Sequence, residues 1–205
     1  MEILKPRKLQ QIVQEDCDQM TSLLFGIPEK RISYCFREII RNTFEHSGAN
    51  ECSVMGQKFE DTNNIEIATI DTGKGVLSAL SNRHKVNSIE SALKLATKPG
   101  ISGADTSGSD EFTNSGFGLY VLSEIGRRFG KFLIGTKGKM MLIRNDGNPQ
   151  FYRAAISGTV VGLNIKTEEY LKNRNIVNQI IDEGESIAAA EGRRVKASAS
   201  SRISI

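Results

Sequence analysis

Residues 36–47 carry polar side chains whose types and spacing are suited to catalysis or metal binding. Glu38 and Asn42 lie four residues apart, and His46 follows after four more, which places all three on one face of a helix. A glutamate can act as a general base towards a water or a hydroxyl. The side-chain oxygen of Asn42 is a neutral ligand suited to Mg²⁺, which keeps several waters and shares substrate phosphates. Taken alone, such a row is more typical of the solvent face of an amphipathic helix.

Two glycine motifs follow in chain order. Asp71 ends a predicted strand and begins Asp-Thr-Gly-Lys-Gly, where its carboxylate could accept a hydrogen bond from an exocyclic amine. Gly73 and Gly75 carry no Cβ, so the backbone there can approach a flat base. Gly116 and Gly118 open a predicted helix, whose free N–H groups form a natural phosphate cradle. Each motif alone is weak, because ordinary turns look the same, but their joint order is much more specific.

Hydrophobic periodicity predicts the elements that must position these residues. Helices are predicted over residues 9–25, 29–47, 76–81, 88–97, 119–128 and 167–190. Strands are predicted over residues 51–59, 65–70, 131–136, 139–144 and 160–165, with a further candidate at 150–155. Residues 98–115 are rich in Gly, Ser, Thr and Asp and predict a long mobile loop. Helices segregated from a largely antiparallel sheet indicate the α+β class.

Length and composition are those of one ordinary soluble domain, with 205 residues, 39% hydrophobic and 25% charged. No apolar run approaches the roughly 18 residues of a transmembrane helix, and the N-terminus lacks the apolar stretch of a signal peptide. Cys17, Cys35 and Cys52 fit neither a disulfide framework nor a zinc site, which favours a reducing cytoplasm. The net charge is +3, and residues 191–205 alone account for it, because they contain four basic residues and one acidic residue. The remainder is close to neutral and does not indicate nucleic-acid binding.

In this order and context, the motifs resemble the nucleotide-binding domain of the GHKL superfamily, which includes gyrase, a heat-shock chaperone, histidine kinases and MutL. The resemblance covers about residues 30–166. Glu38 and Asn42 match the N-box, residues 71–75 the first glycine box and residues 115–119 the second. Ser157-Gly-Thr159 resembles the Gly-Thr that the family places near adenine. The resemblance implies a two-layer α/β sandwich, the Bergerat fold. In it, a mixed and mostly antiparallel sheet carries helices on one face, and a flexible ATP lid would span residues 98–115.

Carried over residue by residue, the resemblance implies a site for ATP and Mg²⁺. Glu38 would be the catalytic base and Asn42 would hold the metal. The cofactor would be bound by the two glycine boxes and the Gly-Thr pair, through Asp71, Gly73, Gly75, Gly116, Phe117, Gly118, Leu119 and Thr159.

The acidic N-box on a domain-sized chain most resembles the bacterial anti-sigma-factor kinases and related stand-alone ATP-binding proteins. Gyrase and MutL relatives need a following domain that donates a lysine, and the roughly 40 residues after Ile165 are too few for one. Residues 1–30 contain no histidine, so a self-contained histidine kinase is not expected. The favoured interpretation is a cytoplasmic serine/threonine kinase that acts on a small protein partner, such as a STAS-like antagonist.

Two alternatives stay open. The same site would suit an ATP-gated switch or ATPase module that captures a partner without phosphorylating it. The glycine loops could also be plain turns with no nucleotide. The chain is expected to divide into an N-terminal helix (1–29) that could contact a partner or a second copy in a homodimer, an ATP-binding domain (30–166), a C-terminal helix (167–190) and a basic, disordered tail (191–205).

Overall fold

Six strands form one open sheet in the computed structural model, which describes residues 6–26, 29–49, 51–103 and 115–203. The strands are β1 (Cys52–Phe59), β2 (Asn64–Asp71), β3 (Gly130–Thr136), β4 (Lys139–Ile143), β5 (Gln150–Arg153) and β6 (Thr159–Lys166). Their order is β1-β2-β6-β3-β4-β5. All pairings among these strands are antiparallel, so the sheet is not the mixed one that the resemblance implied. The last strand, β6, lies between the β1–β2 hairpin and the β3–β4–β5 meander.

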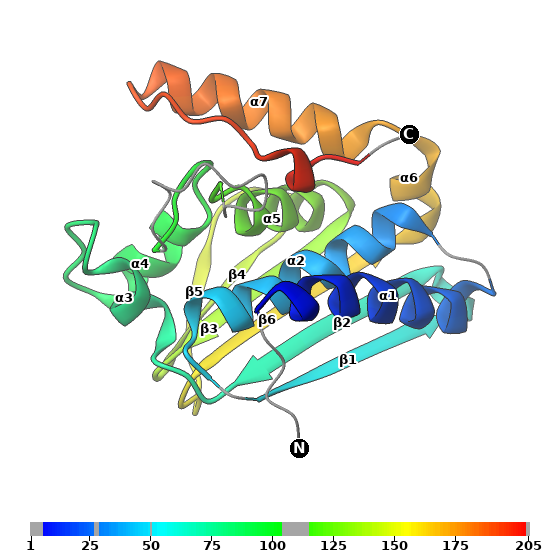
Figure 1. The fold of residues 1–205 in the computed structure, drawn as a ribbon, viewed down its shortest axis with the longest axis horizontal. Coiled ribbons are helices and arrows are strands. Elements are labelled where there is room, and N and C mark those ends of the chain that lie inside the picture. The colour runs from blue at the N-terminus through cyan, green and yellow to red at the C-terminus, as the bar shows by residue number, and fades with distance from the viewer. Residues whose placement is uncertain (1–5, 27–28, 50, 104–114, 204–205) are drawn as a thin grey trace.

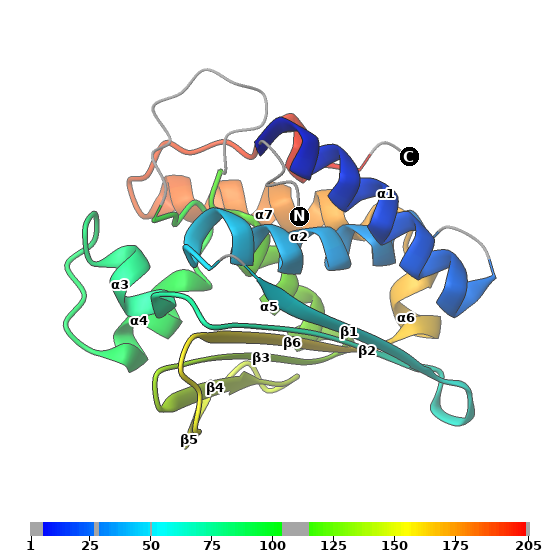
Figure 2. The same cartoon turned by 60° about the horizontal axis from the view of Figure 1, so that its bottom comes forward.

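Helices cover one face of this sheet, as predicted for the α+β class (Figures 1 and 2). The helices against it are α1 (Pro6–Phe25), α2 (Lys30–His46) and α5 (Gly118–Phe129), with the short α3 (Gly75–Leu80) and α4 (Ile89–Ala96) beside one end of the sheet. The remaining helices, α6 (Thr167–Lys172) and α7 (Ile176–Ala190), follow β6, and α7 packs on α5. Within the described ranges, no helix combines the length and apolar character needed to span a membrane.

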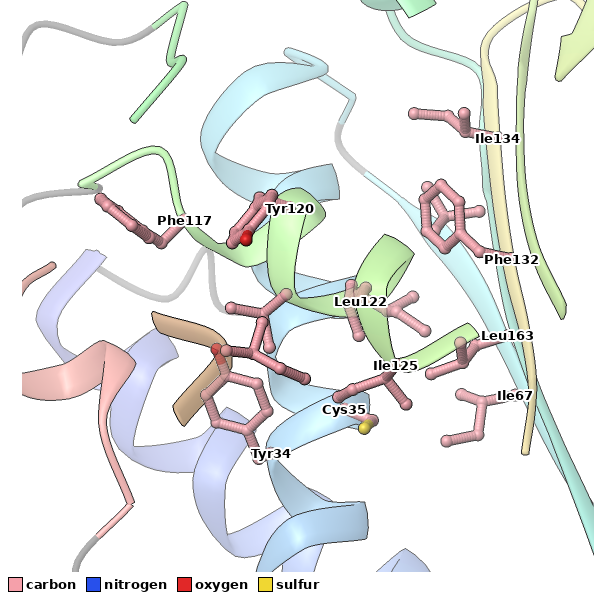
Figure 3. Close-up of a cluster of buried hydrophobic side chains, with 14 of the residues drawn as sticks. Tyr34, Cys35, Ile67, Phe117, Tyr120, Leu122, Ile125, Phe132, Ile134 and Leu163 are labelled. Carbon is pink, nitrogen blue, oxygen red and sulfur yellow. The ribbon is translucent and has the colours of Figure 1, made fainter. Parts of the chain in front are cut away.

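The core lies between the sheet and the helices because each strand turns alternate residues inward. Ile67, Phe132 and Leu163 point from three neighbouring strands towards Leu122 and Ile125 of α5 (Figure 3), and all five are buried. None of the helices in the described ranges lies over the opposite face of the sheet (Figure 2). This packing fixes α5 above the centre of the sheet, so the start of α5 has a defined position.

Two C-terminal features differ from the expectations. The predicted helix at 167–190 is broken, because the Asn173 side chain accepts a hydrogen bond from Asn175 N at 3.0 Å, a turn that competes with helical bonding. Residues 191–203, expected to be disordered, instead run back along α7 (Figure 1). Glu185 accepts hydrogen bonds from Lys196 Nζ at 2.7 Å and Ala197 N at 3.0 Å. We call residues 191–203 the strap.

The Gly126→Ala variant tests how closely α5 approaches the sheet. A Cβ at this position would lie 2.6 Å from both N and Cβ of Phe132, and the backbone of β3 cannot rotate away. Overpacking of this kind costs about 1–3 kcal/mol, more than the roughly 0.5–1 kcal/mol that alanine adds to a helix interior. We expect a net loss of stability in denaturant unfolding. Gly162→Ala is the control, because its nearest neighbours lie at 3.7 Å or more; equal losses in both variants would contradict the close approach.

Candidate functional site

One cavity gathers residues from all the predicted motifs. It is open to solvent, and the space between its walls amounts to about 650 Å³ when the open mouth is included. Its wall combines the end of α2, the β2–α3 loop, the start of α5 and the start of β6. The predicted site residues in that wall are Asn42, Asp71, Gly75, Gly116, Gly118, Leu119 and Thr159.

Glu38 lies behind the cavity wall, on the α2 face that looks towards α5. The residue is 4% exposed, and its Oε1 atom accepts hydrogen bonds from Arg37 Nε and Nη2 at 3.3 and 3.2 Å. Arg41 Nη1 lies 3.6 Å from the same oxygen. The other oxygen, Oε2, would be 2.5 Å from a Cβ on Gly118. The arginines therefore hold one carboxylate oxygen, and the second faces the beginning of α5.

Asn42 lies one helical turn beyond Glu38 and reaches the cavity. Its Nδ2 atom donates to Glu38 O at 2.6 Å, which fixes the side-chain amide. Its Oδ1 accepts no hydrogen bond from the residues described in the structure, so this oxygen is suited to a hard cation. Those residues contain no cluster of three or more His, Cys, Asp or Glu side chains that could hold a metal. A magnesium ion here would take most of its ligands from water and from phosphates.

The start of α5 presents backbone N–H groups without a side-chain cap. Phe117 is the N-cap residue, and no described side chain bonds to the first turn, which leaves donors for an anion together with the positive end of the helix. Gly116 has φ +73°, and a Cβ there would lie 2.6 Å from the Ile101 carbonyl group. Both glycines of this motif are therefore needed for the backbone to pass between α2 and the 100–103 segment.

Asp71 lines the same cavity from the end of β2. Its Oδ1 atom accepts hydrogen bonds from Gly73 N at 2.7 Å and Thr159 N at 3.2 Å. Oδ2 accepts none from the described residues and is left for an amino group in the cavity. Burial raises the pKa of the Asp71 carboxyl, and the two backbone donors oppose that shift. An acceptor with one fixed and one available oxygen suits a single N–H donor on a ligand.

Asp71, Thr159 and Thr136 form one row across three adjacent strands. They are direct partners in the register of β2 with β6 and of β6 with β3, and partners in antiparallel strands share a face. Thr136 Oγ1 donates to Gly158 O at 2.8 Å and accepts from Val76 N at 3.3 Å. A Cβ on Gly75, which has φ +80°, would meet this hydroxyl. The row thus ties the first glycine box to the Gly-Thr pair.

Three predicted residues do not line the cavity. A Cβ on Gly73 would collide with Ser47 O, so this glycine lets the loop dock on the end of α2, where Lys74 N donates to Ser47 O at 2.8 Å. Phe117 is fully buried and packs edge-on against Tyr120, with ring centroids 6.3 Å apart, in the core shown in Figure 3. Glu38 faces Gly118 from behind the wall. Most of the predicted lid falls on residues 104–114, outside the described ranges.

Sequence reasoning missed several residues that shape the site. Thr136 is the most important, and no local signal marks it, because a threonine in a strand is ordinary. Ser47 also lines the cavity, whereas Ile101 and Ser102, which line it too, fall within the predicted lid at 98–115. The sequence predicted Ser47 only as the end of the second helix. Ser47 lies one helical turn beyond Thr43, however, so both residues face the cavity.

Thr136→Val tests the polar row. Valine keeps the shape but leaves Gly158 O and Val76 N without their partner, and an unsatisfied buried polar group costs about 1–3 kcal/mol. We expect the midpoint of denaturant unfolding to fall and ligand affinity in the cavity to weaken. The matched control is Thr62→Val, an exposed position in the 3₁₀ turn Glu60–Thr62. A variant at Thr136 as stable as this control would show that the hydroxyl is dispensable.

Comparisons with known proteins add little to this geometry. No protein-family model matches the chain, and no curated protein matches it. Among solved structures, the chain is similar to the ATPase region of Saccharomyces cerevisiae topoisomerase II, with a TM-score of 0.43 and 14% identity over 75% of this chain and 43% of that one. The chain thus spans less than half the length of that structure. A similarity this weak carries no argument about function, so the site is interpreted from its own residues.

Proposed function

We propose that this protein binds Mg²⁺–ATP as a GHKL-type domain and transfers the γ-phosphoryl group to a serine or threonine of a small protein partner in the cytoplasm. The observation that carries the proposal is the meeting of three motifs, far apart in the sequence, around one cavity. Asp71, an acceptor for an amino group, lines this cavity. Gly118, at the uncapped start of α5, lines it too.

Two groups that line the cavity suit the two ends of a nucleotide. Adenine carries one exocyclic amine, which would donate a hydrogen bond to Asp71 Oδ2, and Gly75 lines the cavity beside this carboxylate. The phosphates would lie against the N-terminus of α5, where backbone N–H groups and the helix dipole stabilise negative charge. Thr159 N, bonded to Asp71 at 3.2 Å, keeps the carboxylate oriented towards the base.

Asn42 Oδ1 would hold Mg²⁺ in this arrangement. The ion supplies charge neutralisation for the phosphates when bound. Positioning and charge stabilisation account for most of phosphoryl transfer, and both would come from residues at the junction of α2 and α5. Glu38 Oε2, facing Gly118, would take the proton of the attacking hydroxyl. The acid at this position favours phosphoryl transfer over simple nucleotide storage.

Calorimetry with ATP, with and without Mg²⁺, tests binding, and labelled ATP tests transfer. We expect saturable ATP binding that weakens when the metal is removed, and label on a small protein encoded beside this one. Absence of binding at millimolar ATP would reject the proposed ATP site. The glycine loops would then be interpreted as ordinary turns. Binding without transfer to any candidate would reject the kinase and leave the ATP-gated switch.

A further inference from the structure

The strap, residues 191–203, contacts the chain near the candidate site on both sides of residues 104–114, which lie outside the described ranges. At the first flank, Lys98 Nζ bonds to Glu191 at 3.1 Å, Arg193 donates to Pro99 O, and Val195 lies where a Cβ on Gly100 would be. At the second flank, Ser201 and Ser115 share a hydrogen bond at 3.2 Å. The strap is therefore part of the surroundings of the cavity, although it is distant in sequence.

Serine hydroxyls cluster where the strap meets the second glycine box. The hydroxyl of Ser198 lies 3.0 Å from that of Ser200 and 2.9 Å from that of Ser201. Ser201 is buried and contacts Ser115, the residue directly before Gly116. A chain of hydroxyl groups thus reaches the loop that precedes the uncapped amides of α5.

The same part of the strap is joined to Glu38 through one guanidinium nitrogen. Arg37 Nη2 donates to Ser200 O at 2.7 Å and to Glu38 Oε1 at 3.2 Å. Arg37 is part of α2, so the strap backbone, the arginine and the carboxylate form one connected group. The strap serines are therefore linked through single contacts to the carboxylate of Glu38 and to the residue before the uncapped start of α5.

We propose that the strap serines are a phosphorylation site in cis, occupying the place of a partner's hydroxyl; this rests on the proposed function. The Oγ atom of Ser201, or of Ser198 or Ser200 beside it, attacks the γ-phosphorus of ATP. A new O–P bond forms, the bond from γ-phosphorus to the bridging oxygen breaks, and ADP leaves with that electron pair. The hydroxyl proton passes to Glu38. Arg37 is placed to pair with the phosphate that results.

Incubation of the full chain with γ-labelled ATP and Mg²⁺ tests the inference. Trypsin cleavage after Lys196 and Arg202 releases residues 197–202, which contain Ser198, Ser200 and Ser201 but not Ser204. We expect label in this peptide, accumulating with a first-order rate that does not depend on protein concentration. Glu38→Gln should slow labelling by about 100-fold or more. The triple variant S198A/S200A/S201A should lose the label while circular dichroism and ATP affinity stay unchanged.

Ser186→Ala is the matched control, because Ser186 is an exposed serine of α7 that bonds only within its helix; it should be labelled like the unmodified chain. ATP binding with no label in residues 197–202 would overturn the inference and leave the nucleotide site standing. A labelling rate that rises with protein concentration would overturn transfer in cis. Absence of ATP binding to the full chain would instead overturn the proposed function itself.

Discussion

Glu38→Gln is expected to lower phosphoryl transfer by about 100- to 10,000-fold, the usual contribution of a positioned general base, with ATP affinity nearly unchanged. Glutamine has the same shape and can still accept hydrogen bonds from Arg37 through its amide oxygen. It cannot take a proton at the atom that faces Gly118. Single-turnover transfer from labelled ATP measures the effect, and calorimetry on the same variant measures affinity.

The control for this variant is Glu66→Gln. Glu66 lies on the exposed face of β2 and bonds to Asn164 at 3.0 Å, so it tests the same chemical change away from the cavity. Transfer that persists at the unmodified rate in Glu38→Gln would exclude Glu38 as the base. Loss of turnover with intact partner capture and intact cellular function would favour the ATP-gated switch over the kinase.

Asp71→Asn should weaken ATP binding by about 10- to 100-fold, the effect of roughly 1–3 kcal/mol from one mispaired buried group. The asparagine Oδ1 can keep the hydrogen bonds from Gly73 N and Thr159 N, so the loop should stay folded. The asparagine Nδ2 atom then replaces Asp71 Oδ2. It donates hydrogen bonds, and so does the adenine amine that it would face, so the two groups cannot pair. Calorimetric titration with ATP measures the loss, and thermal unfolding without nucleotide checks that the fold is intact.

Base specificity gives a second measurement for this variant. Guanine has a carbonyl oxygen where adenine has its amine, so Asp71→Asn should shift the ratio of GTP to ATP affinity towards GTP. Asp61→Asn, in the exposed 3₁₀ turn, is the control and should change neither affinity. Equal weakening of both nucleotides would show that Asp71 supports the loop rather than reading the base.

Much of the site could be predicted from local sequence because its geometry is local. Four-residue spacing alone puts Glu38 and Asn42 on one face of α2, and glycine placement alone predicts a tight backbone at Gly75 and Gly116. The α+β class followed from periodicity. The apposition of Glu38 with Gly118 was not contained in either motif, since it depends on how α2 and α5 pack over the sheet.

The strap and Thr136 could not be predicted, for two different reasons. The strap is poor in apolar residues and reads as disordered, yet its polar groups are satisfied by distant partners such as Glu185 and Arg37. Thr136 acts through Gly158 and Val76, which become its neighbours only once β3 lies beside β6. Pairwise contacts at long sequence separation leave no trace in local composition.

Because Asp71, Thr159 and Thr136 occupy a single rung of the sheet, the proposed ligand affinity of the cavity would also depend on strand alignment. A shift of β6 by one residue would turn Thr159 to the opposite face, and Asp71 and Thr136 would lose their partners Thr159 N and Gly158 O together. A compact chain with native helices but a misaligned β6 is therefore expected not to bind nucleotide. Nucleotide binding, as proposed here for the cavity, would thus distinguish the native sheet from a compact misfolded state with the same helical content.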